Sequence, residues 1–164
     1  MGVLTDYFRA ADAATVVRAL EPTDGGLPPL GADGSFDGVA AKGVDPDVVL
    51  GQLLAAVLGE PWHVDLVTET AVWPTTTPPG PSGLADEDDP WATGPWVTEL
   101  GGATRDALAG VPDDRIPEVV ARWAEAEEWD GADPADLLPL AEELIALARR
   151  ARAAGEQLYC WICL

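Results

Sequence analysis

The single histidine of the chain lies close in sequence to two carboxylates. His63 is followed by Asp65 and then by Glu69. If residues 64–73 form a strand, the three side chains share one face, because alternate residues of a strand point the same way. An imidazole beside carboxylates can act as a general base, and carboxylate oxygens can hold a hard cation. The pattern predicts a candidate site at these residues, although a strand with one solvated face explains the same alternation.

Two cysteines near the end of the chain have a spacing that occurs in zinc and redox sites. Cys160 and Cys163 form a CxxC within the apolar run LYCWICL, which is typical of a buried strand. Positions three apart in a strand point to opposite faces, and the sequence holds no second cysteine pair to complete a metal site. We therefore predict two structural thiols in the core and no metal between them.

A second candidate metal site comes from carboxylates at the end of a predicted helix, 113–128. Glu125 and Glu128 share a helical face by their spacing of three, where the helix dipole disfavours negative charge. A cation or a basic partner would relieve that mismatch, and so would a solvated, frayed helix end. The sequence contains no HExxH, no glycine-rich phosphate loop and no nucleophile motif. We predict no cofactor.

Strand and helix signals alternate along the chain and predict an α+β fold. Asp45-Pro46 and Asp133-Pro134 are typical helix starts, and glycine follows the end of both helices. Alternation and β-branched residues predict strands at 2–10, 36–41, 64–73, 96–100 and 158–164. Apolar residues spaced by three and four predict helices at 12–20, 45–58, 104–109, 113–128 and 133–154.

The length of 164 residues fits one domain, residues 1–164. We expect a small, mostly antiparallel sheet that includes the N- and C-terminal strands, with helices packed on it. The segment Pro74 to Pro95, rich in proline, glycine and acids, is predicted as a loop that is either functional or a tolerated insertion. Trp73, Trp91 and Trp96 bracket this loop and could pin its ends against the domain.

The strongest compositional signal is negative charge. The chain has 29 acids and 9 Lys and Arg, a formal net charge of −20. Residues 43–104, here called the base-free window, contain no Lys or Arg. The acids of the window are Asp45, Asp47, Glu60, Asp65, Glu69, Asp86, Glu87, Asp88, Asp89 and Glu99. Such a field favours basic partners and repels nucleic acid, although compositional drift or salt adaptation would produce the same bias.

Localisation is predicted from what the sequence lacks. The apolar runs are far shorter than the roughly 18 residues that a bilayer span needs, so no membrane association is expected. The first ten residues lack the layout of a secretory signal. A cytoplasmic location is therefore predicted.

Four segments resemble a family of uncharacterised actinobacterial proteins: MGVLTDYF, AKGVDPDVVLGQLLAAVLG, WVTEL and ARRARAAGEQLYCWICL. The resemblance covers most of the chain apart from the loop at 74–95. The order of elements is also similar to the wider YfbM-like group, with an opening strand, a buried helix before a glycine, and a long helix running into an apolar terminal strand. Neither resemblance implies a known activity or a set of catalytic residues.

Two functions of different classes follow from these observations. The first is an acidic binding protein, of immunity type or regulatory, whose base-free window engages a basic protein. The alternative is an enzyme or metal-binding protein with its site at His63, Asp65 and Glu69, or at Glu125 and Glu128. A pocket holding the histidine with a buried carboxylate would favour the enzyme, whereas a convex acidic face would favour the binding protein. The oligomeric state is left open.

Overall fold

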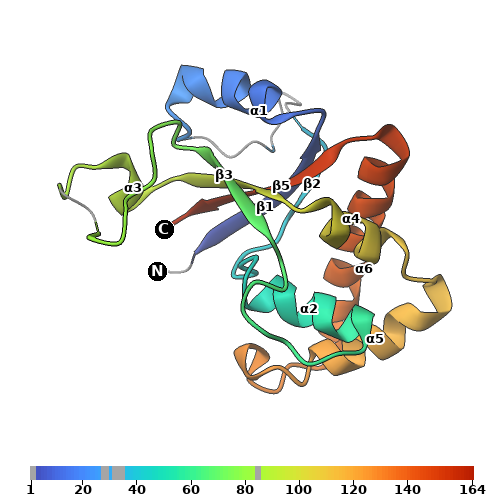
Figure 1. Ribbon diagram of the computed structural model, residues 1–164. Coiled ribbons are helices and arrows are strands. Elements are labelled where there is room, and N and C mark those ends of the chain that lie inside the picture. Colours follow the sequence, from blue (N-terminus) through green and yellow to red (C-terminus); the bar gives the residue numbers. More distant parts are fainter. Residues whose placement is uncertain (1–2, 27–29, 31–35, 84–85) are drawn as a thin grey trace.

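The five strands form one antiparallel sheet in the order β2-β1-β5-β4-β3 (Figure 1). The computed structural model describes residues 3–26, 30, 36–83 and 86–164. Its strands are β1 (Leu4–Ala10), β2 (Gly38–Ala40), β3 (Glu69–Trp73), β4 (Trp96–Leu100) and β5 (Gln157–Cys163). The first and last strands are neighbours at the centre of the sheet, paired from Leu4 with Cys163 to Ala10 with Gln157. This confirms the predicted sheet.

Six α-helices of the described residues pack on this sheet. They are α1 (Ala13–Leu20), α2 (Val49–Leu58), α3 (Pro90–Thr93), α4 (Gly102–Ala109), α5 (Ile116–Trp123) and α6 (Pro134–Ala154). Short 3-10 turns are η1 (Glu21–Thr23), η2 (Asp113–Arg115) and η3 (Glu127–Trp129). Helices α2, α4, α5 and α6 cover one face and α1 the other (Figure 1). The predicted α+β class of a single domain is confirmed.

The terminal strand β5 shows how the sheet separates two hydrophobic clusters. Leu158 and Cys160 point into the large cluster beneath α2, α4, α5 and α6. Tyr159 and Trp161 point into the smaller cluster beneath α1. Alternate side chains of a strand face opposite ways, so a strand covered on both sides must be apolar throughout. This confirms a strand buried on both faces over 158–161, whereas β5 ends at Cys163 and Leu164 is exposed.

The longest helix, α6, begins and ends where its capping residues predict. The Asp133 carboxylate accepts a hydrogen bond from the Ala135 N–H at 2.9 Å, and Gly155 ends the helix in the left-handed region at φ 67°. Pro139 lies inside the helix without interrupting it. A proline removes one backbone donor, and here the adjacent Leu137 and Ala141 remain buried in the large cluster. Packing therefore holds the helix through the proline.

Several helix boundaries differ from the prediction: α4 begins at Gly102 instead of 104 and α5 at Ile116 instead of 113, and two further differences are larger. α2 begins at Val49 because the Asp45 carboxylate accepts the N–H of Val48 at 2.7 Å and stabilises a turn ahead of the helix. α5 ends at Trp123, five residues before the predicted end at Glu128. The chain then turns into η3, where the Trp129 ring meets the Trp123 ring edge-on with centroids 4.9 Å apart. This aromatic contact favours the turn over a longer helix.

No helix within the described ranges has the length and apolar content needed to traverse a bilayer.

Candidate interaction surface

The structure does not place His63, Asp65 and Glu69 on one strand face. β3 begins at Glu69, so the prediction of a strand over 64–73 is wrong for its first five residues. His63 and Asp65 are exposed in the turns between α2 and β3. The His63 Nδ1 lies 2.8 Å from the carbonyl of Val64, and Asp65 has a left-handed backbone at φ 67°. The geometric basis of the predicted general-base site is therefore absent.

Glu69 stands at the start of β3 with its carboxylate turned toward the neighbouring strand. Its Oε2 accepts a hydrogen bond from the Thr98 hydroxyl at 2.5 Å. Although the residue as a whole is exposed, desolvation of the carboxyl group against the sheet raises its pKa. The hydrogen bond from Thr98 opposes this rise, and the negative charges of Asp47 and Asp45 add to it. No cluster of three metal-ligating side chains occurs among the residues that the structure describes.

The second predicted pair is not a helical pair. Glu125 follows α5 and lines a cavity of about 170 Å³ together with Glu60 and Arg122, whereas Glu128 lies in η3. Both glutamates are exposed. Their spacing of three placed them on one face only if the helix continued, and it ends at Trp123. The prediction that the two glutamates share a helical face is therefore wrong.

The two cysteines occupy opposite faces of β5, as the strand prediction required. Cys160 is completely buried in the large cluster, and Cys163 packs against the smaller one. Burial raises the pKa of the Cys160 thiol well above its usual range, and a hydrogen bond with Tyr7 opposes that rise only in part. A thiol held in this state is a poor nucleophile and a poor metal ligand. Both cysteines are free of disulfide bonds.

The acids of the base-free window differ from those outside it in their ion pairs. In the described part of the chain all five salt bridges join residues outside the window. They engage Arg9, Arg105, Arg149 and Arg150 with acids that also lie outside it. No window carboxylate within those residues pairs with a Lys or Arg.

Some of the window carboxylates accept hydrogen bonds from neutral donors instead. The Tyr159 hydroxyl donates to Glu99 Oε2 at 2.8 Å, and the backbone N–H of Trp91 donates to Asp89 at 2.9 Å. Hydrogen bonds from hydroxyl and amide groups leave the negative charge in place. The window thus presents uncompensated charge.

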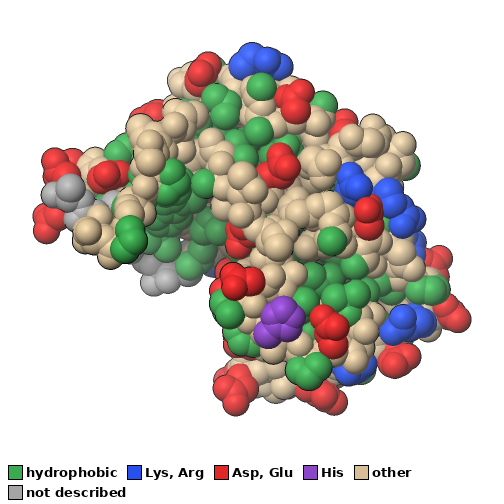
Figure 2. All heavy atoms as spheres, viewed as in Figure 1, with side chains coloured by type: hydrophobic (Ala, Val, Ile, Leu, Met, Phe, Trp, Pro, Cys, Tyr) green, Lys and Arg blue, Asp and Glu red, His purple; other side chains and the backbone are tan. Residues whose placement is uncertain are grey.

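This difference is visible on the surface. Figure 2 shows red carboxylates at the end of the molecule that carries α3 and along the front, where β3 runs. Blue side chains lie at the top of the view, near α1, and over the helices at the right, and red carboxylates lie among them in both places. Because the window carboxylates of the described residues have no ion-pair partner, their negative charge creates a potential that attracts cationic groups.

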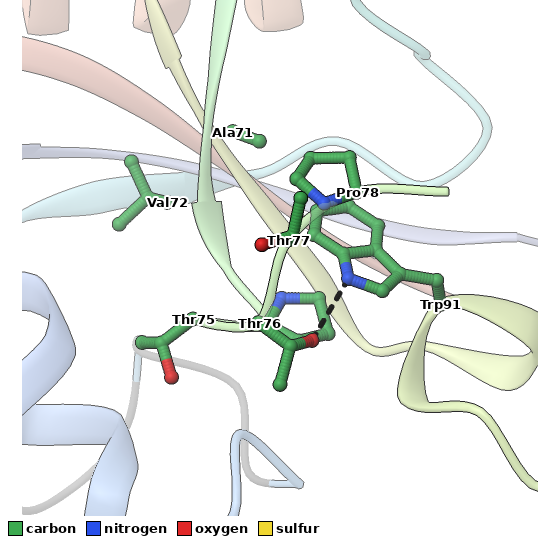
Figure 3. Close-up of a pocket in the computed structure, with 8 residues that line it drawn as sticks. Ala71, Val72, Thr75, Thr76, Thr77, Pro78 and Trp91 are labelled. Carbon is green, nitrogen blue, oxygen red and sulfur yellow. Dashed lines mark hydrogen bonds between the residues drawn. The ribbon is translucent and has the colours of Figure 1, made fainter. Parts of the chain in front are cut away.

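A cavity of about 410 Å³ adjoins the end of β3 (Figure 3). Ala71 and Val72 of the strand line one part of it, and the Trp91 ring lines the other, together with the Thr75–Pro78 segment. The Trp91 Nε1 donates to the Thr76 hydroxyl oxygen at 3.0 Å, which fixes the indole across the loop. Asp89 caps the single turn of α3 that carries the tryptophan.

Sequence reasoning predicted this segment as a loop, either functional or a tolerated insertion, and missed the cavity. The available signal was Asp89-Pro90, the same dipeptide that starts helices at Asp133-Pro134 and a turn at Asp45-Pro46. The prediction that tryptophans hold the loop ends is confirmed for Trp73, which is buried in the smaller cluster. Comparison of the chain with protein-family models, with curated proteins and with solved structures found no match.

Proposed function

We propose that the protein is an acidic interaction protein that binds a basic partner protein through the surface of its base-free window. The observation that carries this proposal is the absence of any ion pair on the window carboxylates among the described residues, whereas four arginines elsewhere are paired. Unpaired carboxylates on one side of a molecule steer cationic groups toward that side and accelerate association. A regulatory or immunity-type role fits, because such proteins act by covering a partner's surface.

Salt dependence of binding tests this proposal. A fluorescent lysine-rich peptide should bind at about 0.01 M sodium chloride and be released near 1 M, where the Debye length falls from about 30 Å to about 3 Å. A glutamate-rich peptide of equal length should not bind at either concentration. Binding of both peptides alike, or of neither, would refute the proposal.

Matched variants separate the window from the total charge. The window variant carries the four changes D86N, E87Q, D88N and E69Q, and the control variant carries D114N, E118Q, E142Q and E143Q. All four control positions are exposed and take part in none of the salt bridges of the described residues. Both variants lose four charges, and we expect only the window variant to raise the peptide Kd, by about tenfold at low salt. Equal weakening would mean that total charge alone drives binding.

A further inference from the structure

The outer edge of β3 is a sheet edge without a neighbouring strand. β3 is the last strand in the order of the sheet, and β4 pairs with its inner edge alone. Glu69, Thr70 and Ala71 are all exposed. In the described part of the chain, no backbone hydrogen bond outside the sheet involves residues 69–73. Unpaired N–H and C=O groups of such an edge are a template for a further strand.

The surface along this edge is open and polar. Figure 2 shows tan backbone and neutral polar atoms where β3 runs, with red carboxylates beside them. At its upper end the strand passes into Pro74, which is buried, and the chain then leaves the sheet. An added strand could therefore follow the edge from Glu69 as far as the cavity that Trp91 lines.

The cavity supplies a place for side chains of the added strand. Its volume of about 410 Å³ lies within the range of sites that hold small ligands or a few side chains. Trp91 is half-buried and its Nε1 is already satisfied by Thr76, so the indole offers its apolar face and has no unmet donor. Rigid aromatic groups in such positions commonly dominate binding energy.

The negative charge around the outer edge of β3 indicates what kind of segment would pair with it. Glu69 stands at one end of the edge, and Asp86, Glu87 and Asp88 precede the helix that carries Trp91. A second copy of this chain would bring the same unpaired carboxylates against one another, which like-charge repulsion disfavours. A segment that alternates lysine or arginine with β-branched residues fits both requirements. Its extended backbone can pair with the edge of β3, and its positive side chains can pair with the nearby carboxylates.

Taken with the proposed function, on which this inference rests, these features assign a binding mode. We propose that an extended, basic segment of the partner adds to β3 as a sixth strand and places an apolar side chain against Trp91. Backbone hydrogen bonds to the edge would provide affinity, and the acids with the indole would select the sequence.

The test uses a synthetic peptide of about eight residues that alternates lysine and valine. Two isomers carry backbone N-methyl groups on alternate residues, one set on each edge of the extended peptide. An added strand turns only one edge toward β3, so one isomer should lose at least about tenfold in affinity and the other should bind as the parent does. Hydrogen exchange at the amides of residues 69–73 should slow on binding.

Protein variants locate the side-chain contact. Trp91→Ala should raise the Kd of the parent peptide by about tenfold or more. The control Leu58→Ala removes an exposed apolar side chain that lies in α2, outside the cavity, and should leave the Kd unchanged. The N-methyl comparison needs no protein variant and stands even if Trp91→Ala fails to fold.

The outcomes distinguish the inference from the proposed function. Salt-sensitive binding that both isomers share would overturn strand addition and leave the proposed function standing. Equal binding by a serine–valine peptide would overturn the proposed function, because charge would then play no part. A concentration-dependent dimer that protects residues 69–73 in hydrogen exchange would assign the edge to a second copy and overturn the inference.

Discussion

Replacing Asp37 with asparagine should lower the free energy of unfolding by about 1 kcal/mol at about pH 7 and by almost nothing near pH 2. The carboxylate of Asp37 accepts two hydrogen bonds from Arg150, at 2.7 and 2.9 Å, and one from Arg9 at 2.6 Å. These contacts join α6, β1 and the residue just before β2. The substitution keeps the shape of the side chain and removes its charge.

The predicted loss in the free energy of unfolding follows from the pKa of the Asp37 carboxyl group. The hydrogen bond from Arg150, and then that from Arg9, lower the pKa of Asp37 from 3.8 to about 2 against an opposing desolvation. At about 1.4 kcal/mol for each tenfold change in proton affinity, the ceiling is roughly 2.5 kcal/mol. The side chains of Asp37 and Arg150 are 36% and 45% exposed, so solvent screening reduces the value to about 1 kcal/mol.

The direction in which this stability contribution changes with pH depends on whether the folded or the unfolded state binds the Asp37 proton more tightly. The unfolded chain binds this proton at higher pH than the folded one, so the contribution is complete above the unfolded value of 3.8. It disappears as the pH falls toward the folded value of about 2. The difference between wild type and Asp37→Asn should therefore narrow across this range.

Urea denaturation at a series of pH values measures the difference. The control Glu143→Gln removes an exposed charge that belongs to none of the salt bridges of the described residues, and its effect should be small at every pH. If the protein unfolds in acid before the series is complete, an NMR titration of the Asp37 carboxyl carbon supplies the pKa directly. A folded pKa at or above 3.8, or a stability difference that does not change with pH, would refute the reasoning.

Three further outcomes are expected. In the native protein a thiol reagent should modify Cys163 and spare Cys160, which is completely buried; equal rates for the two would contradict the burial. Trp123→Phe should cost about 2 kcal/mol in urea denaturation, because the buried Nε1 donates to the Val49 carbonyl at 2.8 Å; a loss below about 0.5 kcal/mol would show that this bond contributes little. The melting temperature should rise with sodium chloride, and neutralising the acids of 86–89 should flatten that rise; a flat response in the wild type would mean that the charges do not destabilise the fold.

The parts of the fold that the sequence predicted well depend on local chemistry. Asp12 accepts a hydrogen bond from the Thr15 N–H at 2.8 Å and starts α1 at the predicted residue. Asp133 and Gly155 bound α6 in the same way. Caps act over three or four residues, so the sequence nearby contains all the information that they need. The apolar run of β5 was equally informative, because only a strand covered on both faces can be apolar throughout.

α3 shows a local signal hidden by its surroundings. Asp89-Pro90 has the chemistry of a helix start, and the structure forms one helical turn there. The flanking proline, glycine and acids made the whole of 74–95 resemble an unstructured loop. What holds Trp91 in place is a hydrogen bond to Thr76, fifteen residues away, and a sequence pattern cannot reveal that partner.

The prediction at His63 was wrong because a strand extends only as far as its partner does. Alternation over 64–73 predicted a strand, and residues 69–73 do form one, but the alternation carried no information on the length of the pairing. β4 ends at Leu100, which pairs with Glu69, and the Gly101 N–H donates to the Thr68 carbonyl at 2.8 Å before the chain turns into α4. Residues before Thr68 have no strand to meet, so the histidine turns away from the sheet. The same pairing leaves Glu69 at the end of an open edge, so the one predicted site residue that remains on the strand lies on the surface that we propose for binding.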